Sequence, residues 1–127
     1  MFKRILLPVD GSLSMTPLVH QCLAFAAGIG AAVVAVHVAA AGGAAQAHAA
    51  RILEDVAGAA RTLGVPCTSH VLAGAEPWQA ILAAAAEHGA DLVCMGSHGR
   101  HGVAEHVLAS QAARVLEHTR LPVLLFR

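Results

Sequence analysis

The amino-acid sequence predicts an α/β protein built on a single doubly wound, five-stranded parallel sheet with helices on both faces. The expected strands are continuously apolar rather than alternating, which is typical of strands that are buried on both faces. Segments with helical periodicity separate these strands, so the expected order is βαβαβαβαβ. A length of 127 residues with 57% hydrophobic side chains fits one compact core. Residues 1–127 are therefore predicted to form a single domain.

The predicted strands are residues 5–9, 31–38, 65–72, 91–95 and 122–126. The first run ends at a polar turn made by Asp10, Gly11 and Ser12. The second is rich in valine, whose β-branched side chain favours strands. Right-handed crossovers between such strands would make the sheet Rossmann-like.

Four helices are expected between the strands, at about residues 14–27, 47–63, 76–88 and 110–118. Apolar residues recur at intervals of three and four in the first, and Ser12 or Ser14 can cap its amino end. Pro77 stands at the first turn of the third helix, where proline is tolerated. Ser110 opens the fourth helix as a residue type that caps helices. Residues 39–46 are expected to be a connector of small residues.

Charge and cysteine usage narrow the class of protein. The 8 basic and 8 acidic side chains balance, so the chain lacks the basic face that nucleic-acid binding needs, and we expect a small-molecule partner. Cys22, Cys67 and Cys94 are widely spaced, which fits buried thiols in a reducing compartment and favours the cytoplasm. The purest apolar stretch, residues 22–36, is too short and too rich in Ala and Gly to span a membrane. Neither a membrane helix nor an export signal is expected.

Two polar turns follow predicted strands at the places where a doubly wound sheet collects ligands. One is residues 10–12 and the other is residues 95–102. The second has glycine at every third position, so its main-chain N–H groups can approach an anion without an intervening Cβ. Arg100 could add a charge-assisted contact. The same glycines also fit a plain tight connector, and the loop matches neither the Walker A nor the dinucleotide-binding motif.

The sequence resembles the universal stress protein family over almost its whole length. The segments that carry the resemblance are KRILLPVDGS at residues 3–12, ADLVCMGSHGR at residues 90–100 and LPVL at residues 121–124. The nucleotide-binding branch of that family has Gly, two residues, Gly, nine residues, and then Gly followed by Ser or Thr. Gly96, Gly99 and Ser110 match this spacing, but Ala109 stands where the third glycine is expected.

The resemblance implies a stress-response regulator that binds an adenine nucleotide, ATP with or without Mg²⁺, at the carboxyl ends of the first and fourth strands. The residues that it implies at the adenosine are Pro8, Val9, Asp10 and Val38. Those implied at the ribose and phosphates are Gly96, His98, Gly99, Ser110 and Gln111, with Met95, Arg100 and Ala109 beside them.

Simpler roles stay open for several of these residues. Asp10 can accept a hydrogen bond from a ribose hydroxyl or the adenine amine, but it can also cap the first turn. Ser110 can be an N-cap without a ligand. The methyl group of Ala109 costs little if φ there is negative, and it strains the backbone or displaces a phosphate if φ is positive.

The alternative function is a dimeric scaffold that binds no nucleotide, because the family also has such members. The apolar last strand would pair or pack with its copy, and the resemblance implies a homodimer, which such an exposed apolar edge supports. His98, His101 and His106 permit a metal site, but their spacing is not diagnostic and no metal is expected. No catalytic set is positioned by a motif, so we expect no enzyme beyond slow ATP hydrolysis. Trp78 is interpreted as a packing anchor.

Overall fold

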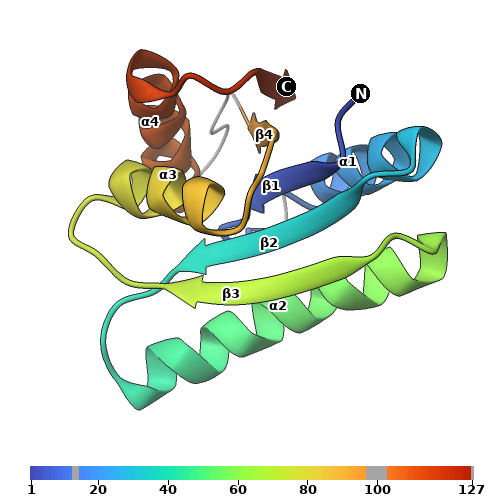
Figure 1. The fold of residues 1–127 in the computed structure, drawn as a ribbon. Coiled ribbons are helices and arrows are strands. Elements are labelled where there is room, and N and C mark those ends of the chain that lie inside the picture. Colours follow the sequence, from blue (N-terminus) through green and yellow to red (C-terminus); the bar gives the residue numbers. More distant parts are fainter. Residues whose placement is uncertain (13–14, 97–102, 127) are drawn as a thin grey trace.

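Five parallel strands form one sheet in the order β3-β2-β1-β4-β5 (Figure 1). The computed structural model describes residues 1–12, 15–96 and 103–126, and for residues 103–110 it describes the backbone alone. The strands are β1 (Arg4–Pro8), β2 (Ala32–Val38), β3 (Cys67–Leu72), β4 (Leu92–Gly96) and β5 (Val123–Phe126). The chain runs outward from β1 to β3 and then returns to β4 on the other side of β1. The predicted doubly wound, Rossmann-like sheet is confirmed.

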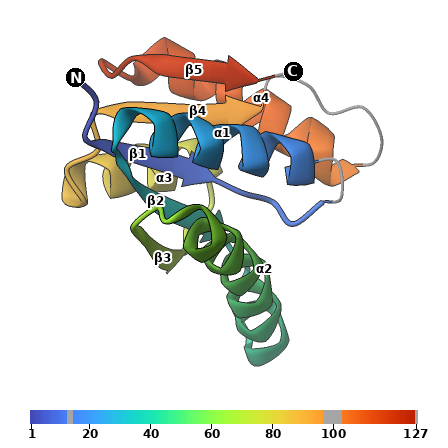
Figure 2. The ribbon, with the colours of Figure 1, turned by 90° about the vertical axis from the view of Figure 1, so that its right-hand side faces the viewer.

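Helices cover both faces of the sheet. They are α1 (Thr16–Ile29), α2 (Gly43–Leu63), α3 (Pro77–Glu87) and α4 (Val103–His118). Figure 2 shows α1 and α2 on the near side of the sheet and α3 on the far side. Gly30 and Gly64 end α1 and α2 in the left-handed conformation that glycine adopts without strain. None of the helices among the described residues is long and apolar enough to cross a membrane.

Two helices begin earlier than the hydrophobic periodicity predicts. α2 starts at Gly43 rather than at residue 47, and α4 starts at Val103 rather than at Ser110. Residues 43–46 (GAAQ) are half alanine, and residues 103–109 (VAEHVLA) include the good helix formers Ala, Glu and Leu, and neither segment contains proline. As a consequence Ser110 lies inside α4 and does not open it, and half of the expected connector at residues 39–46 is helical.

Successive residues of the central strands point alternately into two apolar cores. Ile5 and Leu7 of β1 pack with α1 and α2, whereas Leu6 packs with α3 and α4. None of the three side chains has exposed surface. In β4, Cys94 and Met95 divide between the two cores in the same way. This double burial explains why the strands read as continuous apolar runs in the sequence.

The cysteines of the sheet and of α1 serve as packing residues. Cys22 and Cys94 are buried free thiols in the core beneath α1. The hydrogen bond with Cys94, together with burial, raises the pKa of Cys22 far above its ordinary value. The Cys22 thiol is therefore neutral at physiological pH and unsuited to act as a nucleophile.

Asp91 fixes the amino end of β1. Its carboxylate accepts hydrogen bonds from the main-chain N–H groups of Lys3 and Arg4, at 2.9 and 3.0 Å. Partial burial raises the pKa of Asp91, but the N–H groups of Lys3, Arg4 and Asp91 itself outweigh that effect, so the pKa lies below its ordinary value.

We predict that Asp91→Ala lowers the free energy of unfolding by about 1 kcal/mol at pH 7, because two main-chain donors lose their acceptor. Since the pKa is lower in the folded state, this stabilisation is complete above about pH 4 and is lost as pH falls through the folded-state pKa. Urea unfolding at pH 7 and pH 3 measures both values. Glu117→Ala, at an exposed position of α4, is the control. An Asp91→Ala deficit that is no smaller at pH 3 would contradict the assignment.

Candidate functional site

The candidate site is the carboxyl edge of the sheet at β1 and β4, where the strand order reverses. β1 pairs with β2 on one side and with β4 on the other, in parallel throughout. The carboxyl ends of the three strands therefore meet at one edge (Figure 1). This edge brings together three segments that the sequence singled out: residues 8–10, Val38 and residues 95–96. A crevice outside the carboxyl ends at such a switch point is where doubly wound sheets bind ligands.

The turn after β1 is closed by Asp10. Its Oδ1 accepts a hydrogen bond from the main-chain N–H of Ser12 at 2.9 Å, which is the turn role that the sequence left open for this residue. Gly11 has a φ of 80° and its Cα lies against Ile52, so that a Cβ at this position would approach Ile52 Cδ1 to 2.5 Å. Among the described residues, Oδ1 alone is seen to close the turn, and the second carboxylate oxygen of Asp10 has the chemistry to accept a hydrogen bond from a ligand.

His37 and Val36, both in β2, form hydrogen bonds with Val9, the residue that follows β1. The N–H of Val9 donates to the carbonyl oxygen of Val36 at 2.9 Å. His37 Nδ1 lies 2.8 Å from the carbonyl oxygen of Val9, and because a carbonyl can only accept, Nδ1 carries the proton. The sequence analysis missed His37, since only the register of β1 on β2 brings it to this turn.

The described end of β4, at Met95 and Gly96, is buried. Met95 has no exposed surface, so its side chain belongs to the core. Gly96 lies against α1, and a Cβ at this position would come within 3.0 Å of Leu18 Cδ1. The close approach of α1 therefore gives Gly96 a packing reason to be glycine, beyond the anion contact that the sequence suggested.

Gln111 has a structural partner across the interface of α3 and α4. Its Oε1 accepts a hydrogen bond from the main-chain N–H of Trp78, at the start of α3, at 2.9 Å. Trp78 also stacks on His118, with ring centroids 4.2 Å apart. These contacts support the interpretation of Trp78 as a packing anchor, and they engage the Gln111 oxygen with α3.

Several predicted site residues lie outside what the structure describes. His98, Gly99, Arg100 and His101 fall within residues 97–102, which are not described. Ala109 and Ser110 belong to the backbone of α4, where φ is negative, so the alanine conflicts with no left-handed conformation. Their side chains, like that of His106, are not described. Within the described residues no three His, Cys, Asp or Glu side chains converge as a metal site.

The family model of the universal stress protein family matches residues 1–127, the whole chain. The chain belongs to this family. None of the curated proteins matches it.

Solved structures of the same family have the same fold. A protein of the family from Burkholderia pseudomallei is 27% identical, with a TM-score of 0.79 over 98% of this chain and 95% of that one. A universal stress protein in complex with cAMP is 21% identical, with a TM-score of 0.80 over 99% of this chain and 97% of that one. The universal stress protein from Archaeoglobus fulgidus in complex with dAMP is 24% identical, with a TM-score of 0.75 over 98% of both chains.

We predict that Gly11→Ala lowers the free energy of unfolding by about 2 kcal/mol, because it combines a left-handed φ with overlap on Ile52. The control is Gly28→Ala in α1, where an added Cβ meets nothing within 4 Å. That substitution should stabilise the protein by about 0.5–1 kcal/mol. Urea unfolding of both variants tests the turn. A Gly11→Ala variant as stable as the parent would show that the turn does not have this conformation.

Proposed function

We propose that this protein binds an adenine nucleotide, ATP or a close relative, at the carboxyl edge of β1 and β4 and acts as a stress-response regulator. The observation that carries the proposal is the placement of Asp10, Val38 and Gly96 at the switch point of the sheet. Membership in the universal stress protein family supports it. Solved members in complex with cAMP and dAMP, which share an adenine, support it further.

The chemistry of the edge suggests which end of the nucleotide lies where. Val38 is partly buried against the core of α3 and α4, so it can give the base an apolar surface. The second carboxylate oxygen of Asp10 can accept a hydrogen bond from a ribose hydroxyl or the adenine amine, while its charge repels phosphates. The phosphates therefore belong at the β4 end of the edge. The main-chain amides of the first turn of α4, which begins at Val103, have no partner within the helix itself.

We propose further that the nucleotide acts by occupancy rather than by rapid turnover, with Mg²⁺ as a companion of the phosphates. Asp10 is committed to a turn through one oxygen, which favours a positioning role over that of a general base. At most, positioning of a bound triphosphate would give slow hydrolysis. The three free cysteines fit a reducing compartment such as the cytoplasm.

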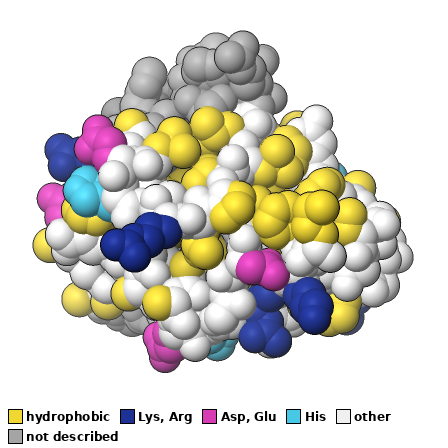
Figure 3. Space-filling model, turned by 45° about the horizontal axis from the view of Figure 1, so that its top comes forward, with side chains coloured by type: hydrophobic (Ala, Val, Ile, Leu, Met, Phe, Trp, Pro, Cys, Tyr) yellow, Lys and Arg dark blue, Asp and Glu magenta, His cyan; other side chains and the backbone are white. Residues whose placement is uncertain are grey.

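A homodimer through β5 is a second proposal, which holds whether or not a nucleotide binds. β5 is an edge strand of the sheet, and its Leu125 is 38% exposed. Phe126 and Leu124 are only partly buried against the core of α1, as are Phe2 and Phe25. Figure 3 shows hydrophobic side chains gathered in a band on the side of the molecule that carries these elements. An apolar edge strand is suited to pairing with a second copy.

We predict that Asp10→Asn weakens ATP binding about tenfold, or about 1.4 kcal/mol. Asparagine keeps an oxygen that can close the turn, but its amide group cannot accept the second hydrogen bond. Isothermal titration with ATP and Mg²⁺ measures the change, with Asp55→Asn as the matched control on α2. Equal affinities of the parent and Asp10→Asn would remove Asp10 from the site. Absence of heat with ATP, AMP and cAMP up to millimolar concentration would contradict nucleotide binding as a whole.

We predict that Leu125→Glu converts a dimer to a monomer, because it buries a charge in the paired edge. Val71→Glu is the matched control, since Val71 lies on the opposite edge strand β3 with 37% exposure. Light scattering after gel filtration gives the mass of each variant. A parent protein that is already monomeric, or a dimer that only Val71→Glu disrupts, would contradict pairing through β5.

A further inference from the structure

A cleft of about 300 Å³ opens between α1 and α2. Its floor is apolar and comes from the end of β1 and the two helices: Val9, Met15, Val19, Ile52 and Val56. All five side chains belong to the core beneath α1 and α2, whereas Val38 packs on the core of the opposite face. The cleft is therefore on the other face of the sheet from the surface on which the adenine is proposed to lie.

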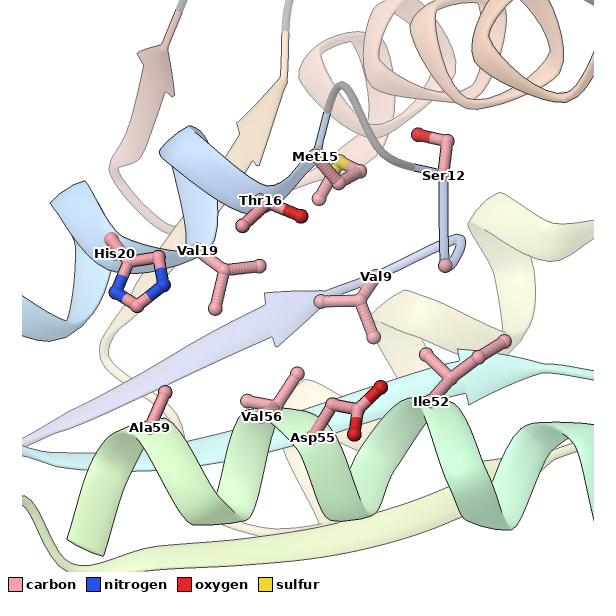
Figure 4. Close-up of a pocket in the computed structure, with 11 residues that line it drawn as sticks. Val9, Ser12, Met15, Thr16, Val19, His20, Ile52, Asp55, Val56 and Ala59 are labelled. Carbon is pink, nitrogen blue, oxygen red and sulfur yellow. The ribbon is translucent and has the colours of Figure 1, made fainter. Parts of the chain in front are cut away.

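The rim of the cleft is polar and carries one acidic group. Asp55 rises from α2 toward α1, with Thr16 and His20 on the α1 side (Figure 4). With histidines counted as neutral, Asp55 is the single charged residue among those that line the cleft within the described chain. The neighbouring Glu54 pairs with Arg61 at 2.9 Å. Asp55 has no such partner among the described residues.

We propose that this cleft is a binding site for a small organic amine that carries a hydrophobic ring. An aliphatic cavity of about 150 Å³ accepts a benzene molecule, so a cleft of twice that volume has room for one ring with a short substituent. The apolar floor removes the ring from water, and the Asp55 carboxylate pairs with the ammonium group at the rim. An anion of the same shape meets an unfavourable charge there.

This proposal does not rest on nucleotide binding. The ligand that the cleft selects is cationic, whereas a nucleotide is anionic, and Val38, the proposed surface for the adenine, packs on the opposite face of the sheet from the floor of the cleft. The two sites meet at Val9 and the turn after β1, because Val9, Gly11 and Ser12 line the cleft and are neighbours of Asp10 in the sequence. Benzylamine should therefore bind in the presence of saturating ATP, and displacement by ATP would overturn a separate amine site.

The test is a titration of the ¹⁵N-labelled full chain with benzylamine, followed by amide chemical shifts. We expect saturable shifts centred on Val19 and Val56, and at least fivefold weaker binding in Asp55→Asn. Glu54→Gln removes the same charge one residue away from an acid that is already paired, and it should change the affinity less than twofold. Equal effects of the two substitutions would overturn the assignment of Asp55.

Two further measurements separate a shaped site from general attraction of a cation. Benzoate, which has the same ring and the opposite charge, should bind at least fivefold more weakly than benzylamine, and equal affinities would overturn the proposal. Ala59→Leu adds bulk to a residue that lines the cleft and should abolish the saturable shifts. The control Ala113→Leu, at an exposed position of α4, should leave them unchanged. Undiminished binding in Ala59→Leu would place the amine elsewhere.

Discussion

Burial of β1 and β4 on both faces is the constraint on which this structure depends. Residues 5–7 and 93–95 have no exposed side-chain surface, and they point alternately into a core under α1 and α2 and a core under α3 and α4. Both layers of helices are needed to cover such strands, so polar groups are excluded from the faces of the central sheet. Ligand chemistry is left to the edges of the sheet and to the seams between helices.

The same constraint explains why the strands could be predicted from the sequence. Apolar runs bounded by glycine, proline and polar turns place β1 and β4 to within a residue or two, while the more polar β3 was placed by its position between two helical segments. The starts of α2 and α4 were harder to predict, because the first turn of α2 consists of small and polar residues without an apolar stripe, and α4 begins directly after a glycine-rich segment. Ser110 has the chemistry of a cap, but the favourable helix propensity of residues 103–109 extends α4 past it.

Some features of the candidate site could likewise be predicted from the sequence, and others could not. Asp10 and Gly96 could be predicted because each directly follows a strand, and parallel strands bring their carboxyl ends to one edge. His37 on the carbonyl of Val9 and Gln111 on the N–H of Trp78 depend on strand register and on how α4 packs on α3. Local sequence does not encode either contact. The α1–α2 cleft could not be predicted either, because it depends on how the two helices pack. In the sequence, Asp55 is only one residue of a polar helix face.

The central claim is that the carboxyl edge of β1 and β4 binds an adenine nucleotide, and amide chemical-shift mapping with Mg²⁺ and ATP tests it most directly. The largest shifts are expected at residues 9–12, Val38 and Gly96, with little change at the opposite edge around Arg4 and Asp91. Shifts that cluster at Arg4 and Asp91, or that spread evenly over the surface, would contradict the claim.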